Sequence, residues 1–241
     1  MPDDARRMLE VRLWRGGDEG RFQTYRVPAR AKQTVLDVVT EVQRRHAPDL
    51  AYRFACRVGV CGTCAMTVNG IPRWTCRTRV RRVARDGNLT VEPLRSLPRI
   101  RDLVVDLAPF FERWDRAGGR FVPTRSRTEE PARVDPESPE RRSVDEAIEC
   151  INCAVCHAAC DVVAADADYL GPAPLLRAWT LVNDIRHGDR PGTLARASAR
   201  GGCASCHAMG NCMKHCPVAL RPAEGIAGLK RLTLLAALGR R

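Results

Sequence analysis

Two hydrophobic periodicities alternate along the first part of the chain. Every second position is apolar in two neighbouring segments with glycines between them, which predicts a hairpin of two strands. These positions are Leu9, Val11 and Leu13, followed by Tyr25 and Val27. From Val35 to Val42 the apolar residues recur at helical spacing behind Thr34, a candidate helix cap. Leu89 and Val91 alternate again and predict a closing strand, so we expect a small mixed α/β domain of roughly 100 residues.

The second part of the chain shows mainly helical spacing. Ser143 and Glu146 are placed as in a capping box, which predicts that a helix begins there. Another helix is expected from about Pro174 to Ile185, with Gly188 as its stop signal. A last helix is expected over about 222–238.

A stretch at about 115–142 separates these two parts. It is rich in Gly, Pro, Arg and Glu and poor in apolar residues, which is typical of a connector that wraps over a surface. We therefore predict two domains, 1–106 and 107–241, with the connector in the second.

The chain is basic, with a formal net charge of +12. Clustered Lys and Arg would suggest nucleic acid or an anionic membrane as partner. Here Arg is spread over nearly the whole length, Lys occurs only at Lys32, Lys214 and Lys230, and aromatic residues make up 5%. Few side chains could therefore stack on bases, and we predict no nucleic-acid partner.

The beginning of the chain lacks the apolar core of a secretory signal, and no run of about 18 apolar residues could span a bilayer. We expect a cytoplasmic, reducing location. In such a compartment 12 cysteines point to metal ligation rather than to disulfides.

The first group of cysteines has the C-x4-C-x2-C spacing of plant-type 2Fe-2S ferredoxins, followed by a fourth cysteine. The predicted ligands are Cys56, Cys61, Cys64 and Cys76. Gly59 and Gly62 suit a loop that must adopt positive φ angles close to a cluster. A zinc site that uses Cys61 and Cys64, or buried thiols, are the alternatives.

The second group contains two related runs. The first, C-x2-C-x2-C-x3-C, is the ferredoxin run whose last cysteine binds the other of two clusters. It consists of Cys150, Cys153, Cys156 and Cys160. The second run is Cys206, Cys212 and Cys216 before Pro217, with Met209 where another cysteine would stand.

Crossing the ligands of the two runs predicts one cluster with four cysteines and one with three. The first set is Cys150, Cys153, Cys156 and Cys216, which suits 4Fe-4S. The second set is Cys160, Cys206 and Cys212, which suits 3Fe-4S because the Met209 thioether is a weak ligand. A double zinc ribbon is the alternative for these cysteines. Cys203 fits neither set and is interpreted as a small buried apolar residue or as an alternative ligand.

With these motifs in hand, the chain resembles the iron-sulfur subunits of succinate:quinone oxidoreductases, which comprise succinate dehydrogenase and fumarate reductase. The resemblance rests on the ordered segments CRVGVCGTCAMTVNG, VEPLRSLPRIRDLVVDLAPFFERW, ECINCAVCHAAC, GPAPLLRAW and CHAMGNCMKHCP. It implies an α+β fold, with an N-terminal β-grasp 2Fe-2S ferredoxin domain followed by an α-helical ferredoxin domain.

The resemblance also implies an oxidoreductase subunit of the tricarboxylic acid cycle. Single electrons would pass between the FAD of a flavoprotein subunit and membrane quinone through the 2Fe-2S, 4Fe-4S and 3Fe-4S clusters. The dicarboxylate site would lie on the flavoprotein, and a membrane-anchor subunit would hold this chain peripherally at the cytoplasmic face of the inner membrane. The direction of electron flow, the quinone type and the presence of haem on the anchor stay open. The alternative is an electron-transfer module of another soluble flavin-dependent reductase.

His207 matches the position at which family members carry a histidine beside the 3Fe-4S cluster and near the quinone. It is a candidate quinone contact, with a packing role as the alternative, whereas His157 and His215 are interpreted as structural. Two departures bear on the quinone site. Asp161 replaces the usual proline, and the following segment VVAADADYL lacks the tryptophan of members with a well-defined ubiquinone pocket. Val58 stands where an acidic residue is common in the first cluster loop.

Overall fold

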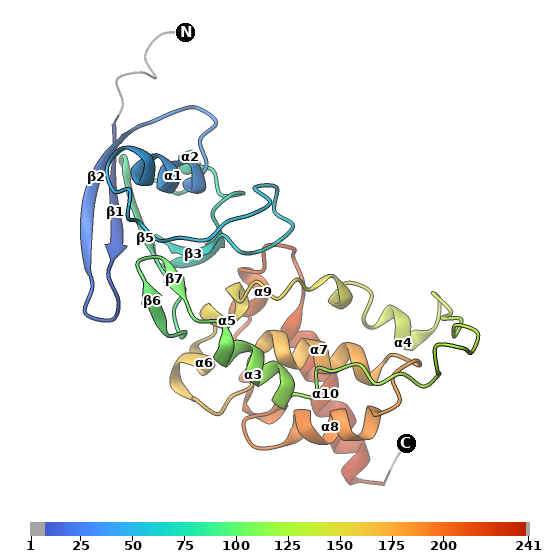
Figure 1. Ribbon diagram of the computed structural model, residues 1–241. Helices are drawn as coiled ribbons and strands as arrows, with labels where there is room; N and C mark the ends of the chain where they lie inside the picture. Colours follow the sequence, from blue (N-terminus) through green and yellow to red (C-terminus); the bar gives the residue numbers. More distant parts are fainter. Residues whose placement is uncertain (1–7, 240–241) are drawn as a thin grey trace. The chain divides into compact units, whose positions relative to one another are not determined.

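The computed structural model describes residues 8–239, which form two compact units (Figure 1). The first unit contains the described residues up to Leu107 together with Ile151–Ala159. The second contains Ala108–Cys150 and the described residues from Cys160 onward. A short segment of the second cysteine group thus packs with the first unit. The predicted limits of the two domains stay a prediction.

The first unit is built on a five-stranded mixed sheet with the order β2-β1-β5-β3-β4. The strands are β1 (Met8–Arg15), β2 (Arg21–Pro28), β3 (Ala65–Val68), β4 (Ile71–Trp74) and β5 (Asn88–Glu92). The predicted hairpin is confirmed, because β1 and β2 pair antiparallel over their whole length. The strand predicted to close the domain lies instead at the centre of the sheet, where β5 runs parallel to β1 and antiparallel to β3.

Helix α1 (Val35–Arg45) packs on this sheet and confirms the predicted helix. Its N-cap Thr34 accepts a hydrogen bond from the backbone N–H of Asp37, and the Asp37 side chain accepts one from the backbone N–H of Thr34. This reciprocal capping box satisfies two donors that would otherwise be unpaired. The valines of α1 and the inward residues of β1 and β5 then form one buried core. The remaining elements of this unit are α2 (Val80–Val83), β6 (Arg99–Arg101), β7 (Val104–Val105) and α5 (Val155–Ala158).

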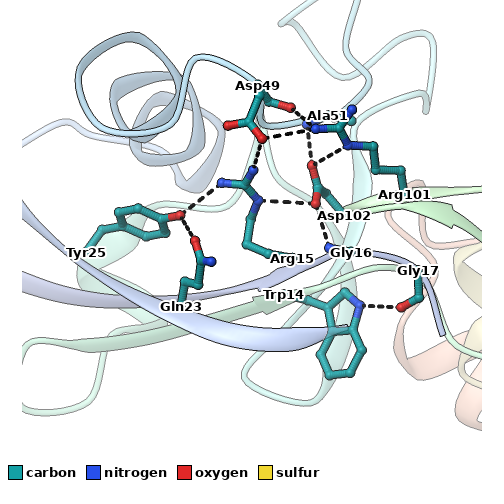
Figure 2. Close-up of polar contacts among 10 residues, drawn as sticks. All are labelled: Trp14, Arg15, Gly16, Gly17, Gln23, Tyr25, Asp49, Ala51, Arg101 and Asp102. Carbon is teal, nitrogen blue, oxygen red and sulfur yellow. Dashed lines mark hydrogen bonds and ion pairs between the residues drawn. The ribbon is translucent and has the colours of Figure 1, made fainter. Parts of the chain in front are cut away.

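A buried carboxylate, Asp102, joins three parts of the first unit (Figure 2). Its oxygens accept hydrogen bonds from the backbone N–H groups of Gly16 and Ala51, at 2.7 and 2.8 Å, and from Nε of Arg15 at 3.1 Å. Arg15 also pairs with Asp49 at 2.6 Å. Because Ala51 begins the segment that leads to the first cysteine loop, the network fixes where that loop starts.

The second unit is helical, as predicted. Its longer helices are α3 (Ala108–Arg116), α7 (Pro172–Val182), α8 (Arg190–Ser198) and α10 (Pro222–Ala237). Its short elements are α4 (Pro139–Arg142), η1 (Ala147–Glu149), α6 (Asp161–Ala165), η2 (Cys203–Ser205) and α9 (Asn211–Lys214). Helices α7 and α10 pack so closely that a Cβ atom at Gly228 would lie only 2.5 Å from the ring of Trp179. In residues 8–239 no helix is long and apolar enough to cross a membrane.

Three expectations about this unit were wrong or incomplete. Ser143 does not begin a helix: it follows α4, whose N-cap is Ser138 with Pro139 at the first helical position. Helix α7 begins at Pro172 and ends at Val182, both earlier than expected. At its end, the Asn183 side chain donates to the carbonyl of Trp179 and caps the helix. Helix α8 was not predicted, although the cap Asp189, which accepts from the Gly192 N–H, was a usable signal. The last predicted helix is confirmed by α10.

Candidate metal centres

The first cysteine loop of the first unit already prepares one thiolate. The sulfur of Cys56 accepts backbone N–H groups from Val60 and Cys61, at 3.3 and 3.4 Å. These contacts lower the pKa of Cys56 to about 6, and the hydrogen bond from Val60 contributes most. Gly59 and Gly62 make the tight loop possible with φ angles of +78° and +72°. A thiolate is the form that binds iron, so the loop suits a cluster ligand.

The hairpin of β3 and β4 brings two further cysteines together. Cys64 immediately precedes β3 and Cys76 lies just after β4, and the carbonyl of Cys64 accepts hydrogen bonds from the N–H and hydroxyl of Thr75. Both cysteines are buried. The pKa of Cys76 is raised to about 12, mainly by burial and to a smaller extent by the neighbouring Cys64. Such a thiol becomes a thiolate when a metal takes its proton's place.

These two cysteines belong to an apolar cluster. It contains Leu36, Cys64, Trp74, Cys76 and Val155, with Ile151 and Cys153 packed against it. The buried indole N–H of Trp74 has no hydrogen-bond partner among residues 8–239. Sulfur atoms of a bound cluster are acceptors for such an orphaned donor, and the donor set of four cysteines is the one that 2Fe-2S requires. The residues present therefore fit this group.

Gly62 marks a very close approach between the first loop and the second cysteine group. A Cβ atom at this glycine would lie 2.5 Å from the Cβ of Cys153 and 3.3 Å from Cδ1 of Ile151. Both partners belong to the segment that packs with the first unit. Glycine is thus required at position 62 for two reasons: the φ angle is positive, and there is no room for a side chain.

In the second unit, the three cysteines of the predicted three-ligand set line a single pocket. They are Cys160, Cys206 and Cys212. The sulfur of Cys206 accepts the backbone N–H of Ala208 at 3.4 Å. Asp161, the residue that replaces the usual proline, begins α6 and accepts a hydrogen bond from the side chain of Asn211 at 2.9 Å. This bond joins α6 to α9 beside the pocket.

Burial dominates the electrostatics of this pocket. It raises the pKa of Cys160, and it raises the pKa of Cys212 to about 11. Tyr169, which is 1% exposed, also lines the pocket together with Cys206. Burial, and then the negative charge of the surrounding thiolates, raises the pKa of Tyr169. Iron would supply the positive charge that the buried Cys212 and the half-buried Cys160 and Cys206 need as thiolates, so the pocket fits an iron-sulfur cluster.

Met209 and Cys203 take different places in the second unit. Met209 lines the three-cysteine pocket and is 62% exposed. Cys203 lies in the hydrophobic core, with its sulfur 4.0 Å from the hydroxyl of Thr233. This location favours the packing interpretation of Cys203.

Sequence reasoning missed two neighbours of the pocket. Tyr169 carried no signal beyond its place after the cysteine run. Lys230, on α10, donates from Nζ to the carbonyl of Cys206 at 2.7 Å, and nothing in its local sequence indicated this contact. His207 was predicted, and it is exposed at the same pocket.

The predicted four-cysteine set stays a prediction from the spacing alone. Cys153 and Cys156 belong to the first unit, and Cys150 and Cys216 to the second. The nearby histidines have structural surroundings: Nε2 of the buried His157 lies 3.4 Å from the carbonyl oxygen of Ser96, and His215 is the C-cap of α9. Among residues 8–239, no three Cys, His, Asp or Glu side chains converge as they would around a single metal ion.

Comparison with known proteins places both cysteine groups in families. Residues 9–112 match the 2Fe-2S iron-sulfur cluster binding domain, and residues 149–221 match the 4Fe-4S dicluster domain. Together with the mixed-sheet unit and the helical unit, these matches define a two-domain iron-sulfur protein of the ferredoxin type. The predicted α+β fold class is confirmed.

Three relatives show to which family within this class the chain is similar. The chain is 35% identical over 216 residues to the fumarate reductase iron-sulfur subunit of Mycobacterium tuberculosis, covering 87% of this chain and 84% of the relative. It is 33% identical over 202 residues to the corresponding subunit of Escherichia coli, with 84% and 82% covered. It is 35% identical over 218 residues to a mitochondrial succinate dehydrogenase [ubiquinone] iron-sulfur subunit of Oryza sativa, with 88% and 68% covered.

A solved structure agrees with these relatives. A chain of the Mycobacterium smegmatis Sdh1 complex in the apo form has a TM-score of 0.85 and 27% identity, with 96% of this chain and 97% of that chain covered. The chain therefore belongs to the family of iron-sulfur subunits of succinate dehydrogenase and fumarate reductase. The predicted resemblance and electron-transfer role are confirmed. The family matches favour iron-sulfur clusters over the zinc sites that the cysteine spacing had left open.

Proposed function

We propose that this chain relays single electrons between the FAD of a flavoprotein subunit and membrane quinone. The observation that carries the proposal is the pocket lined by Cys160, Cys206 and Cys212, with Met209 also in its lining. A pocket with three thiol ligands suits a 3Fe-4S cluster, which together with the 2Fe-2S and 4Fe-4S domains gives three one-electron carriers.

The ligand sets are part of the proposal. Cys56, Cys61, Cys64 and Cys76 would hold the 2Fe-2S cluster. Cys150, Cys153, Cys156 and Cys216 would hold 4Fe-4S, and the three pocket cysteines would hold 3Fe-4S. When bound, the clusters accept and release one electron at a time. The chain binds them, donates hydrogen bonds to sulfur and limits their access to water, which sets their potentials.

The partners follow from the family. A flavoprotein subunit would carry the dicarboxylate site and FAD, and a membrane-anchor subunit would hold the chain peripherally at the cytoplasmic face of the inner membrane. The Sdh1 relative comes from a complex, and no helix of residues 8–239 could itself cross a membrane. These two observations support a peripheral subunit.

His207 is proposed as a quinone contact. It is exposed at the pocket of the three cysteines, so its imidazole can reach a molecule that approaches Cys206 and Met209 from outside. An imidazole donor there could bind a quinone oxygen and supply a proton.

The test is isolation of the intact complex with this chain. We expect a membrane-anchor subunit to co-purify, succinate-linked quinone turnover, and an oxidised 3Fe-4S signal in low-temperature EPR that disappears on mild reduction. His207→Ala should slow quinone reduction and leave reduction of the clusters by succinate intact, whereas the exposed His46→Ala in the first unit should change neither. A complex without an anchor would instead support a soluble flavin-dependent reductase, and normal quinone turnover in His207→Ala would assign this histidine to packing.

A further inference from the structure

A second pocket of the second unit shares no residue with the cysteine pocket. It lies between the region of α4 and the end of α7, and its volume is about 430 Å³. This volume is in the usual range of small-molecule sites. The residues that matter for its chemistry are Arg141, Ile148, Arg177, Asp184, Ile185 and Arg186.

Arg141 brings an unsatisfied donor to this pocket. Its Nη2 pairs with Asp145 at 2.8 Å, but the buried Nη1 has no hydrogen-bond partner among residues 8–239. The Asp145 side chain is 70% exposed, so water screens much of its attraction. A buried donor without a partner costs free energy, so the surroundings of this guanidinium satisfy it only in part.

Arg177 adds a second, partly desolvated cation. Its Nε donates to the carbonyl of Gly119 at 3.1 Å, and its guanidinium lies 5.4 Å from the ring centre of Trp114. Burial lowers the pKa of Arg177, which means that the surroundings do not fully compensate its charge.

The acidic residue of the pocket is already neutralised. Asp184 accepts two hydrogen bonds from the guanidinium of Arg186, at 2.9 and 2.7 Å. Asp184 and the Cys150 thiolate still attract Arg177, but Asp184 shares its negative charge with Arg186. The lining of the pocket thus holds three arginines and one aspartate, and the wall offers apolar surface as well, because Ile148 and Ile185 are each 49% exposed.

We propose that this pocket binds an organic carboxylate, with the charged group on Arg141 and Arg177 and the aliphatic part against Ile148 and Ile185. A planar carboxylate matches the fork of a guanidinium. A bare phosphate would leave the isoleucines exposed. The carboxylate can belong to a free small molecule or to an acidic side chain of a partner subunit. The site contains no cysteine and is independent of the electron-transfer proposal.

The test is calorimetric titration of the full-length, cluster-loaded chain and of the intact complex with hexanoate. Hexanol and inorganic phosphate serve as probes that lack the charge and the tail. We expect saturable binding of hexanoate and at least tenfold weaker binding of both other probes. A free small-molecule site binds hexanoate in chain and complex alike. A site filled by a partner binds it in the free chain only.

The matched variants are Arg141→Gln and Arg142→Gln. They remove one charge from the same helical turn, but Arg142 is exposed, pairs with Glu137 and does not line the pocket. We expect at least tenfold weaker hexanoate binding in Arg141→Gln and unchanged binding in Arg142→Gln. Arg141→Lys, which keeps the charge without the fork, should be intermediate. Equal binding in the two glutamine variants, or no binding of hexanoate to the unmodified chain, would overturn the proposal.

Discussion

The cysteine loop of the first unit and the cysteine pocket of the second unit present the same donor atom in opposite surroundings. In the loop, Cys56 is half-buried and its sulfur accepts two backbone N–H groups, which lower its pKa. In the pocket, burial raises the pKa of Cys160 and Cys212. The loop favours a thiolate before any metal arrives, whereas the pocket depends on the metal to displace the protons.

This difference also applies to the means by which each site is built. The loop relies on backbone conformation, above all at Gly59 and Gly62, whereas the pocket relies on side chains that packing has buried, above all Tyr169. Substitutions that alter backbone freedom should therefore harm the first site most. Substitutions that remove a polar atom from a buried side chain should mainly tune the second.

The largest effect is expected from removing a pocket ligand. Cys212→Ser should abolish the 3Fe-4S signal and lower the iron content, because two thiolates cannot replace three in a buried site. Cys203→Ser is the matched control, since Cys203 is also buried in the same unit but lies outside the pocket. Iron and sulfide analysis with EPR measures both variants. Full iron content in Cys212→Ser would refute this ligand assignment.

The next largest effect concerns the backbone of the loop. Gly62→Ala combines a positive φ angle with a clash against Cys153, whereas Gly70→Ala has a similar φ of +77° and nothing within 4 Å. We expect Gly70→Ala to cost about 1 kcal/mol of unfolding free energy and Gly62→Ala at least about 2 kcal/mol more. Chemical denaturation followed by circular dichroism gives both values. Equal costs would mean that the close approach to Cys153 is easily relaxed.

A smaller effect is expected where the polar network fixes the start of the loop. Asp102→Asn keeps a residue type that tolerates the φ of 50°, but it leaves Arg15 without a buried carboxylate. We expect a loss of about 2 to 3 kcal/mol, at the lower end for a broken buried pair because Arg15 keeps Asp49. Asp49→Asn, at a 62% exposed side chain, should cost much less. If the two variants unfold alike in denaturant, the buried carboxylate is not the centre of the network.

The smallest effect is a change of redox potential at the pocket. Tyr169→Phe removes a buried hydroxyl from the lining of the pocket that holds Cys206, and a hydroxyl dipole there stabilises the reduced, more negative cluster. We expect the 3Fe-4S potential to fall by roughly 40 mV, the equivalent of about 1 kcal/mol for one electron. Redox titration by EPR measures it. Tyr52→Phe in the first unit, whose hydroxyl lies 3.1 Å from that of Thr40, should leave this potential unchanged.

Local sequence determined the parts of the protein whose contacts are local. The hairpin of β1 and β2 and the capped helix α1 follow from apolar spacing and from Thr34, because these signals and their partners lie within a few residues. The cysteine runs likewise indicated the kinds of cluster, since a cluster constrains the spacing of its ligands along the chain. The family matches agree with that interpretation.

Only the tertiary structure decided which distant residues meet. Nothing in NLTVE distinguishes an edge strand from a central one, yet β5 pairs with both β1 and β3. The place of Lys230 on the carbonyl of Cys206 and the approach of Gly62 to Cys153 are equally invisible along the chain. Such contacts depend on the packing of whole elements, and a short segment of sequence reports its own periodicity but not the surface that will cover it.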